Sequence, residues 1–170
     1  MLVGEIMDIG VRNLAYSEAE MIWAINEEGL PGTGKVSQQE IKALLEFSSL
    51  SIGAYLEDRL VGFVICLPPN TEYGSLNYAW FNQRYDKFLY VDRIAVSVES
   101  QNQNIGSILY EHVKKQAEEM GVLVAAEVNI YPPNPGSMRF HDRHGFEQVG
   151  VLDHDEKSVA LFVYNSNEGK

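Results

Sequence analysis

The segment Val91–Ser107 most constrains what this chain can fold into, because an apolar stretch runs there directly into a short polar loop that opens a helix. From Ile105 the apolar residues follow helical spacing as far as Met120, and Gly121 stands where a glycine commonly ends a helix. The first amides of a helix lack partners within it and lie at the positive end of its dipole, so this arrangement favours an anion. The sequence therefore predicts a strand over Phe88–Val98 followed by a site for a ligand that carries phosphate.

Size and composition point to one folded domain over residues 1–170. The chain has 170 residues, of which 45% are hydrophobic and 22% charged, both ordinary values for a globular protein. No apolar run approaches the ~18 residues needed to cross a bilayer, and the N-terminal residues do not resemble a signal peptide. The single cysteine, Cys66, lies in an apolar run and suits a reducing compartment. We therefore expect a core cysteine, no membrane association and a cytoplasmic location.

The net charge of −11 argues against nucleic acid as a partner, because binding to a phosphate backbone requires a basic surface. The same charge conflicts with an anionic ligand, and backbone amides with a helix dipole would relieve that conflict because neither needs Lys or Arg. An acidic protein also suits a cationic amine substrate, although solubility alone would explain the charge equally well.

The remaining pattern predicts strands and helices that alternate around a mixed sheet, which is an α/β or α+β fold. Two capping boxes, Ser17–Glu20 and Ser37–Glu40, each predict a helix start. The aromatic-rich connection Asn70–Lys87 is expected to be a long functional loop. Two further strands are expected over Ile6–Leu14 and Val122–Ile130. One hairpin is expected to pair Ser51–Glu57 with Leu60–Leu67, and a second to pair Phe146–Leu152 with Val159–Tyr164. A helix is expected between Asn134 and Gly145.

Two blocks of residues give the chain a family resemblance. The first is the triplet Ile94–Val96 followed by Gln101, two residues, Asn104, one residue and Gly106; the second begins at Asn134 and ends at Gly145 and Phe146. With these blocks the chain resembles the GNAT superfamily of acyl-CoA-dependent N-acyltransferases from about Ile9 to Tyr164. Asn104 stands where the family has a glycine, and asparagine is the other residue best tolerated at positive φ.

The resemblance implies a single GNAT-like domain with a central mixed, largely antiparallel sheet that is splayed between its fourth and fifth strands and flanked by helices. It also implies that acetyl-CoA, or CoA, binds along two segments without a metal, and the histidines show no zinc-ligand spacing. The expected cofactor-binding residues are Ile94, Ala95 and Val96 for the pantetheine, Gln101, Asn102, Gln103, Asn104, Ile105, Gly106 and Ser107 for the pyrophosphate, and Asn134, Ser137 and Phe140 on the later helix.

Acetyl transfer to an amine requires that the amine lose a proton, so a base or a water chain is needed. Asp92 and Glu127 are the candidate bases, and each could instead pair with a neighbouring group. His141 occupies the position at which most relatives carry a tyrosine thought to protonate the leaving thiolate, and a packing role is its alternative. The expected acceptor-binding residues are Trp23, Asn26, Tyr78, Trp80 and Tyr90, although the aromatic ones could simply cap the core.

The resemblance thus implies a bacterial, cytoplasmic N-acetyltransferase that moves an acetyl group directly from acetyl-CoA to a primary amine. The acceptor is a small molecule or a peptide, and the sequence does not choose between them. The alternative is a non-catalytic acyl-CoA-binding or protein-interaction module that keeps the same fold. The oligomeric state is also open, with a homodimer as one option.

Overall fold

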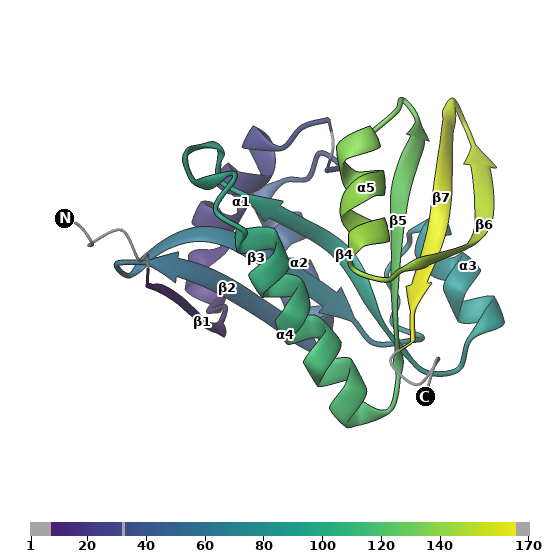
Figure 1. Cartoon of the computed structure of the whole chain (residues 1–170), viewed down its shortest axis with the longest axis horizontal. Helices are drawn as coiled ribbons and strands as arrows, with labels where there is room; N and C mark the ends of the chain where they lie inside the picture. The colour runs from purple at the N-terminus through teal and green to yellow at the C-terminus, as the bar shows by residue number, and fades with distance from the viewer. Residues whose placement is uncertain (1–7, 32, 166–170) are drawn as a thin grey trace. The chain divides into compact units, whose positions relative to one another are not determined.

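Seven strands, hydrogen-bonded in the order β1-β2-β3-β4-β5-β7-β6, form the sheet in a computed structural model that describes residues 8–31 and 33–165. The chain forms two compact units, one made of the residues up to Ile65 with Arg93–Leu109 and the other of Cys66–Asp92 with the residues from Tyr110 onward. The strands β3 (Arg59–Leu67) and β4 (Phe88–Val96) each run from one unit into the other (Figure 1). This strand order and the alternation with helices confirm the predicted mixed sheet.

The first unit begins with β1 (Ile9–Asn13), which pairs antiparallel with β2 (Leu50–Leu56) in the register Ile9 to Leu56. Part of the predicted first strand, residues 6 and 7, lies outside the described residues. Between these strands lie the turn η1 (Tyr16–Glu18) and helices α1 (Ala19–Glu28) and α2 (Gln38–Phe47). Apolar residues of these elements and of β3 form the core of the unit, among them Ile22, Ile25, Ile41, Leu44, Ala54, Phe63 and Val64.

The two predicted capping boxes have different outcomes. Ser37 caps α2 as expected, since its Oγ accepts from the Glu40 N–H at 3.0 Å and Glu40 Oε1 accepts from the Ser37 N–H at 2.9 Å. The box predicted at Ser17 was wrong, because Ser17 lies inside η1 and the helix starts at Ala19. Glu18 Oε1 instead accepts from the Ala15 N–H at 2.8 Å, so the N-cap of the turn η1 is Ala15, two residues before the predicted cap Ser17.

The second unit contains the helix that the sequence pattern missed. The connection Asn70–Lys87 was predicted as a loop, yet α3 (Leu76–Arg84) forms within it, capped by Ser75 Oγ, which accepts from the Tyr78 N–H at 3.2 Å. The other predicted elements appear with small shifts: β5 (Leu123–Tyr131), α5 (Pro135–Arg143), β6 (Glu147–His154) and β7 (Lys157–Tyr164). Helix α4 (Ile105–Met120), which runs from the first unit into this one, has the predicted bounds, and Gly121 follows it at φ +71°.

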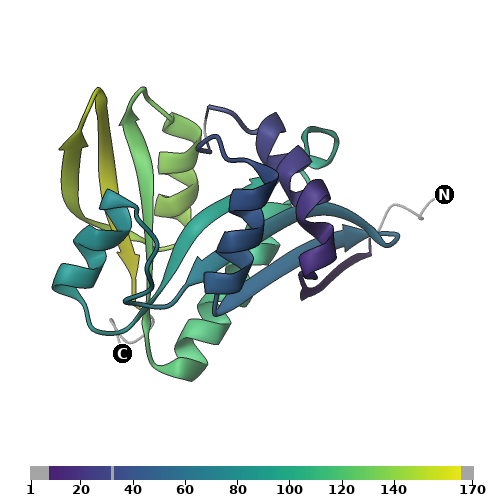
Figure 2. The same cartoon turned by 180° about the vertical axis from the view of Figure 1, so that it is seen from behind.

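Strand pairing in the second unit explains which side chains share a face. Strand β4 pairs parallel with β5 over Phe88–Tyr90 and Leu123–Ala125, the first three residues of each. From Val124 onward β5 pairs antiparallel with β7, so Ala126 lies opposite Phe162. Helix α5 is drawn beside β5 in Figure 1, and its His141 ring stacks on Phe162 of β7, whereas α3 is drawn in front of the strands when the molecule is seen from behind in Figure 2. The two helices therefore cover opposite faces of these strands.

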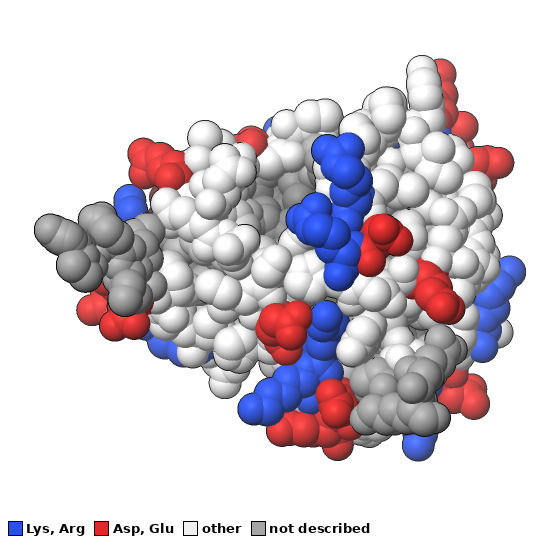
Figure 3. Space-filling model, in the orientation of Figure 1, with Lys and Arg blue, Asp and Glu red and all other residues white. Residues whose placement is uncertain are grey.

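Charged side chains of both signs lie next to one another on the face of the molecule drawn in Figure 3, and most of that face is uncharged. Basic side chains gather over the position of α5, which carries Arg139 and Arg143 with Asp142 between them. Within residues 8–31 and 33–165, no helix is both long and apolar enough to cross a membrane.

Candidate active site

The predicted cofactor-binding segment of the first unit starts at the end of β4, which is anchored to β3. The Ser97 N–H donates to the Val61 carbonyl at 2.8 Å, and the Ser100 N–H donates to the Ser97 carbonyl at 3.0 Å within the turn η2 (Val98–Ser100). This turn ends β4 at Val96, two residues before the predicted end. At Gly62 of β3, a Cβ atom would lie 3.3 Å from the Ala95 carbonyl oxygen and 3.0 Å from a methyl group of Ile105. The glycine therefore allows β3 to approach the segment closely.

The loop Gln101–Asn104 is exposed, and two of its residues have left-handed backbone conformations. Asn102 has φ +68° and Asn104 has φ +62°, so asparagine at position 104 adopts the conformation expected where the family has glycine. The Ile108 N–H donates to the Asn104 carbonyl at 2.9 Å, which is the first hydrogen bond of α4. A helix start leaves its first amides without partners in the helix, so the loop and helix start can receive an anion. The segment thus holds ten predicted cofactor-binding residues: Ile94–Val96 and Gln101–Ser107.

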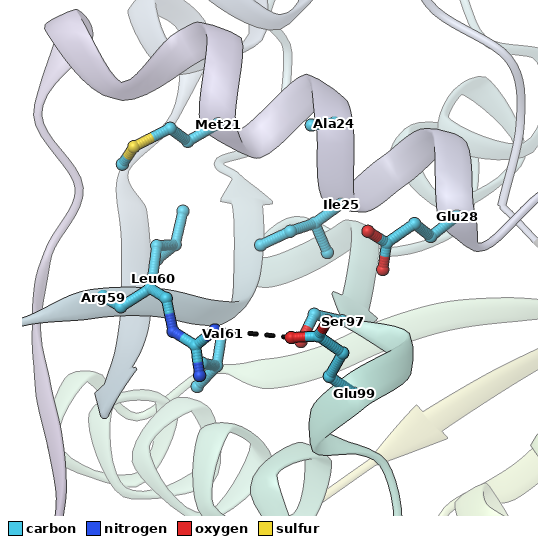
Figure 4. Close-up of a pocket in the computed structure, with 9 residues that line it drawn as sticks. All are labelled: Met21, Ala24, Ile25, Glu28, Arg59, Leu60, Val61, Ser97 and Glu99. Carbon is cyan, nitrogen blue, oxygen red and sulfur yellow. Dashed lines mark hydrogen bonds and ion pairs between the residues drawn. The ribbon is translucent and has the colours of Figure 1, made fainter. Parts of the chain in front are cut away.

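A pocket in the same unit adjoins the turn that precedes this loop (Figure 4). Glu28, at the end of α1, accepts through Oε1 from the Val98 N–H at 2.8 Å, and Arg59 pairs with Glu99 at 3.3 Å. The pocket has a volume of about 270 Å³ and is lined by Met21, Ala24, Ile25, Glu28, Arg59, Leu60, Val61, Ser97 and Glu99. Because the Glu28 acceptor is a charged carboxylate, its hydrogen bond to the Val98 N–H is stronger than one to a neutral acceptor. This bond holds the turn η2, which precedes the loop.

Two residues predicted to bind the acceptor, Trp23 and Asn26, hold the connection between α1 and α2. The Trp23 indole N–H donates to the Val36 carbonyl at 2.9 Å. Asn26 is fully buried; its Nδ2 donates to the Gly34 carbonyl at 3.0 Å, and its Oδ1 accepts from Arg93 at 3.0 Å. Arg93 also donates to the Gly34 carbonyl at 2.9 Å. These contacts hold the connection between α1 and α2 at Gly34, so Asn26 supports this connection rather than facing solvent.

In the second unit the structure brings together Tyr90 and Glu127, which are 37 residues apart in sequence. The Tyr90 hydroxyl donates to Glu127 Oε1 at 2.8 Å, so this candidate base has a hydrogen-bond partner within its largely apolar strand. Burial raises the pKa of Tyr90 well above its ordinary value, and the carboxylates of Glu127 and Asp92 raise it further. Tyr90 therefore stays protonated and can donate, while Asp92 contributes negative charge to the same neighbourhood.

Helix α3 packs its aromatic side chains around this pair. The ring of Tyr78 lies 5.1 Å from that of Tyr90, and Phe81 lies 5.9 Å from it. Tyr78 is fully buried, and its hydroxyl donates to the Pro68 carbonyl and accepts from the Thr71 N–H. Trp80 packs on β6, where a Cβ at Gly150 would lie 2.6 Å from its ring, and the Arg84 guanidinium lies 4.0 Å from the ring centroid. Tyr78 thus packs against Tyr90 of the Tyr90–Glu127 pair, and Trp80 packs against β6.

His141 lies on the other face of β5 and β7, away from the Tyr90–Glu127 pair. Its ring stacks on Phe162 with 5.8 Å between centroids, and Phe162 lies opposite Ala126. Because side chains alternate along a strand, the neighbouring Glu127 points to the opposite face, toward α3. The sequence grouped His141 with Asp92 and Glu127, but the structure separates them by the thickness of the sheet.

Both ring nitrogens of His141 have protein partners. Nδ1 lies 2.8 Å from the Ser137 carbonyl oxygen, so it carries the proton and donates, and Nε2 accepts from the Tyr110 hydroxyl at 2.7 Å. Burial lowers the pKa of His141, which favours this neutral form. A neutral histidine that accepts at Nε2 and has its only N–H engaged is poorly suited to protonate a leaving group. Its surroundings favour the packing role over the acid role predicted from its sequence position.

The remaining predicted cofactor-binding residues surround His141 on α5. Asn134 caps the helix, with its Oδ1 accepting from the Ser137 N–H at 3.3 Å, and Pro135 occupies the first helical position as predicted. The ring of Phe140 lies 5.1 Å from that of Tyr110. These residues define the start and the inner face of α5.

Three residues of these sites were missed by sequence reasoning, and two of them left a signal in the sequence. Arg93 is an arginine in a buried strand, which requires hydrogen-bond partners. Tyr110 occupies a core position of α4, where a buried hydroxyl also requires a partner. Glu28 offered no such signal, because its contact with Val98 joins residues 70 positions apart. In the described residues no group of three or more His, Cys, Asp or Glu side chains is arranged to hold a metal ion.

Comparison with known proteins places these features in a family. The model of the acetyltransferase (GNAT) family matches residues 16–146. The Drosophila melanogaster protein named Probable N-acetyltransferase san is 28% identical over 116 residues, which span 68% of this chain and 56% of that protein. The fold is similar to that of Arabidopsis thaliana NAA60 in complex with acetyl-CoA, with a TM-score of 0.74, 19% identity and coverage of 93% and 99% of the two chains. It is also similar to Arabidopsis thaliana Naa50 in complex with the bisubstrate analogue CoA-Ac-MVNAL, with a TM-score of 0.70, 15% identity and coverage of 92% and 98%. The family match covers most of the chain, and the protein therefore belongs to the acetyltransferase (GNAT) family.

Proposed function

We propose that this protein is an N-acetyltransferase that moves an acetyl group from acetyl-CoA directly to a primary amine, with Glu127 as the base. The observation that carries the proposal is the Tyr90–Glu127 hydrogen bond of 2.8 Å, because it fixes a carboxylate on a largely apolar strand in a family of acetyltransferases. The loop Gln101–Asn104 and the start of α4 supply the expected site for the pyrophosphate of acetyl-CoA, which is a substrate of the reaction.

The chemistry assigned to the chain's own residues is proton removal and orientation. The Glu127 carboxylate takes a proton from the ammonium form of the acceptor, and the neutral nitrogen then attacks the thioester carbonyl carbon. The new C–N bond forms, the C–S bond breaks, and the thiolate leaves and takes up a proton. Tyr90 donates to one carboxylate oxygen, so it orients Glu127.

The acceptor we propose is the N-terminal amine of a peptide. This choice is supported by the relatives: Arabidopsis thaliana Naa50 is bound to an analogue that joins CoA to the acetylated sequence MVNAL, and NAA60 is bound to a bisubstrate analogue. A small-molecule amine is the other acceptor class and is tested alongside. A cytoplasmic location is part of the proposal and is supported by the buried, unpaired cysteine Cys66. A bacterial origin and a homodimer stay predictions.

The test is release of free thiol from acetyl-CoA in the presence of a panel of peptides and small amines. We expect a dissociation constant for acetyl-CoA near the micromolar range, about −8 kcal/mol, and thiol release that depends on an amine. The Glu127→Gln variant keeps the acceptor oxygen for Tyr90 but cannot take a proton, so kcat should fall by ~10²–10⁴ with acetyl-CoA affinity unchanged. Glu147→Gln, on the exposed face of β6, is the matched control and should leave kcat unchanged.

Two outcomes would contradict the proposal in different ways. Saturable binding of acetyl-CoA without thiol release for every amine would favour the non-catalytic acyl-CoA-binding module. Full activity in Glu127→Gln would leave the enzyme assignment intact and exclude Glu127 as the base. Asp92, whose charge acts on the same tyrosine, would then be the next candidate.

A further inference from the structure

Asn77 on α3 has a buried polar atom that the protein itself does not satisfy. Its side-chain oxygen Oδ1 is inaccessible to solvent and, among the residues that the structure describes, has no hydrogen-bond partner. Leaving an acceptor buried without a partner destabilises the folded protein, so such atoms are rare. A bound molecule that donates a hydrogen bond would remove that destabilisation. Asn77 thus has the property expected of a ligand-binding residue.

The position of Asn77 associates it with the Tyr90–Glu127 pair. It is the second residue of α3, directly before Tyr78 and one helical turn before Phe81. Tyr78 and Phe81 are the two side chains with which α3 packs on the Tyr90 ring, at 5.1 and 5.9 Å. Residues four apart lie side by side on a helix, so Asn77 and Phe81 share one face of α3. Asn77 therefore lies on the face of α3 that carries Phe81, one of the two side chains that pack on the Tyr90 ring.

The other asparagine of α3 shows that the helix does not require an unsatisfied amide. Asn82 Oδ1 accepts from the Asn70 N–H at 2.9 Å and so ties the preceding loop to the helix. The two asparagines differ in this respect: Asn82 has a structural partner for its acceptor oxygen, and Asn77 has none among the described residues.

We propose that Asn77 is a specificity-determining residue that binds the acceptor through Oδ1, and that it selects acceptors carrying a second N–H donor close to the reacting amine. A side-chain carbonyl oxygen accepts and cannot donate, so its ligand must be a donor. In a peptide, the first amide N–H is such a donor, separated from the terminal amine by one residue, whereas a simple alkylamine has none. This inference rests on the proposed function and deepens it from amines in general to α-amines followed by an amide.

The test compares two substrates in two proteins. The substrates are a short peptide and the same peptide methylated on its first amide nitrogen, which removes the N–H and keeps the terminal amine. In the unmodified protein, methylation should lower kcat/KM by about tenfold, or about 1.4 kcal/mol. In Asn77→Leu, which keeps the size of the side chain and removes the oxygen, the unmethylated peptide should lose the same factor and methylation should have no further effect.

The Tm of Asn77→Leu and a control variant distinguish a loss of acceptor binding from a loss of folding. Because Asn77→Leu replaces an unsatisfied buried acceptor with apolar atoms, its Tm should stay equal or rise while kcat/KM falls, which a merely structural residue would not show. Gln83→Leu, an exposed residue on the same helix, should change neither the kinetics nor the response to methylation.

Three results would overturn the inference. The first is an equal response to methylation in the unmodified protein and in Asn77→Leu. The second is a fall in Tm in Asn77→Leu that accounts for the loss of activity. The third is turnover of simple alkylamines with no preference for peptides. Absence of turnover with every amine would instead contradict the proposed function itself, which the acetyl-CoA assay with small amines detects separately.

Discussion

At the scale of single residues, the surroundings of a side chain decide its role more than its position in a motif. Asn104 could be predicted because asparagine has its own tendency to adopt positive φ, and its φ of +62° follows from local chemistry. The role of His141 could not, since it depends on Tyr110, Ser137 and Phe162, which only the folded chain brings to it. The role of Glu127 could be predicted only in part. A carboxylate in a largely apolar strand needs a partner, but the sequence does not show that the partner is Tyr90.

The buried, neutral state of His141 predicts how stability depends on pH. Burial lowers its pKa in the folded protein below the ordinary value of about 6.5 that it has when unfolded. Above pH 6.5 His141 is neutral in both the folded and the unfolded protein, so its contribution to the free energy of unfolding is fully present. As the pH falls below 6.5, the unfolded chain takes up a proton that the folded protein does not, so stability is lost until the folded-state pKa is reached.

Thermal unfolding at a series of pH values between about 7.5 and 5 measures this effect. The Tm of the unmodified protein should fall more steeply toward acid than that of His141→Gln, which has no titrating ring. His112→Gln, on the exposed side of α4, should keep the steep dependence. Equal slopes in the unmodified protein and His141→Gln would show that the histidine has the same pKa in both states.

At the scale of elements, the strength of the local signal determined what the sequence could predict. Helix α4 has the predicted bounds because its apolar residues keep a helical period over 16 residues and Gly121 ends it at positive φ. Helix α3 was missed because it has only 9 residues and its aromatic side chains suggested a loop, although Ser75 caps it. A long amphipathic helix can be recognised from its own sequence pattern. A short aromatic helix forms only with the strand against which it packs, and its own sequence does not reveal that strand.

The left-handed loop conformation before α4 gives a prediction about acetyl-CoA. Asn104→Gly should keep or slightly tighten acetyl-CoA binding, because glycine adopts φ +62° without a steric penalty. Asn104→Val should weaken it by about tenfold, since a β-branched residue pays about 1–2 kcal/mol in that conformation. Calorimetric titration of acetyl-CoA into both variants provides the measurement, and the glycine variant is the control for the loss of the side chain. A clear loss of affinity in Asn104→Gly would instead reveal a direct contact by the asparagine amide.

At the scale of the whole molecule, the sequence predicted charge and fold class but not the pairings between distant segments. The net charge of −11 and the strand–helix alternation are properties of composition and order, so they were available at once. The contacts Tyr90–Glu127 and Arg93–Asn26 join residues 37 and 67 positions apart, and they depend on strand order and register. A single sequence carries no signal for such pairs beyond the need of each buried polar group for a partner.

The net charge also predicts a dependence of the rate on salt that distinguishes acceptors. A protein with a charge of −11 attracts cationic substrates over distances that salt shortens, since the Debye length falls from about 10 Å at 0.1 M to about 3 Å at 1 M. With acetyl-CoA saturating, raising the salt from about 20 mM to about 500 mM should lower kcat/KM about tenfold for a peptide with added lysines. The neutral peptide of the same length should change little, because it is not attracted at long range. If both peptides lost activity equally, salt would be acting on the protein or on acetyl-CoA binding, and the acidic surface would serve solubility alone.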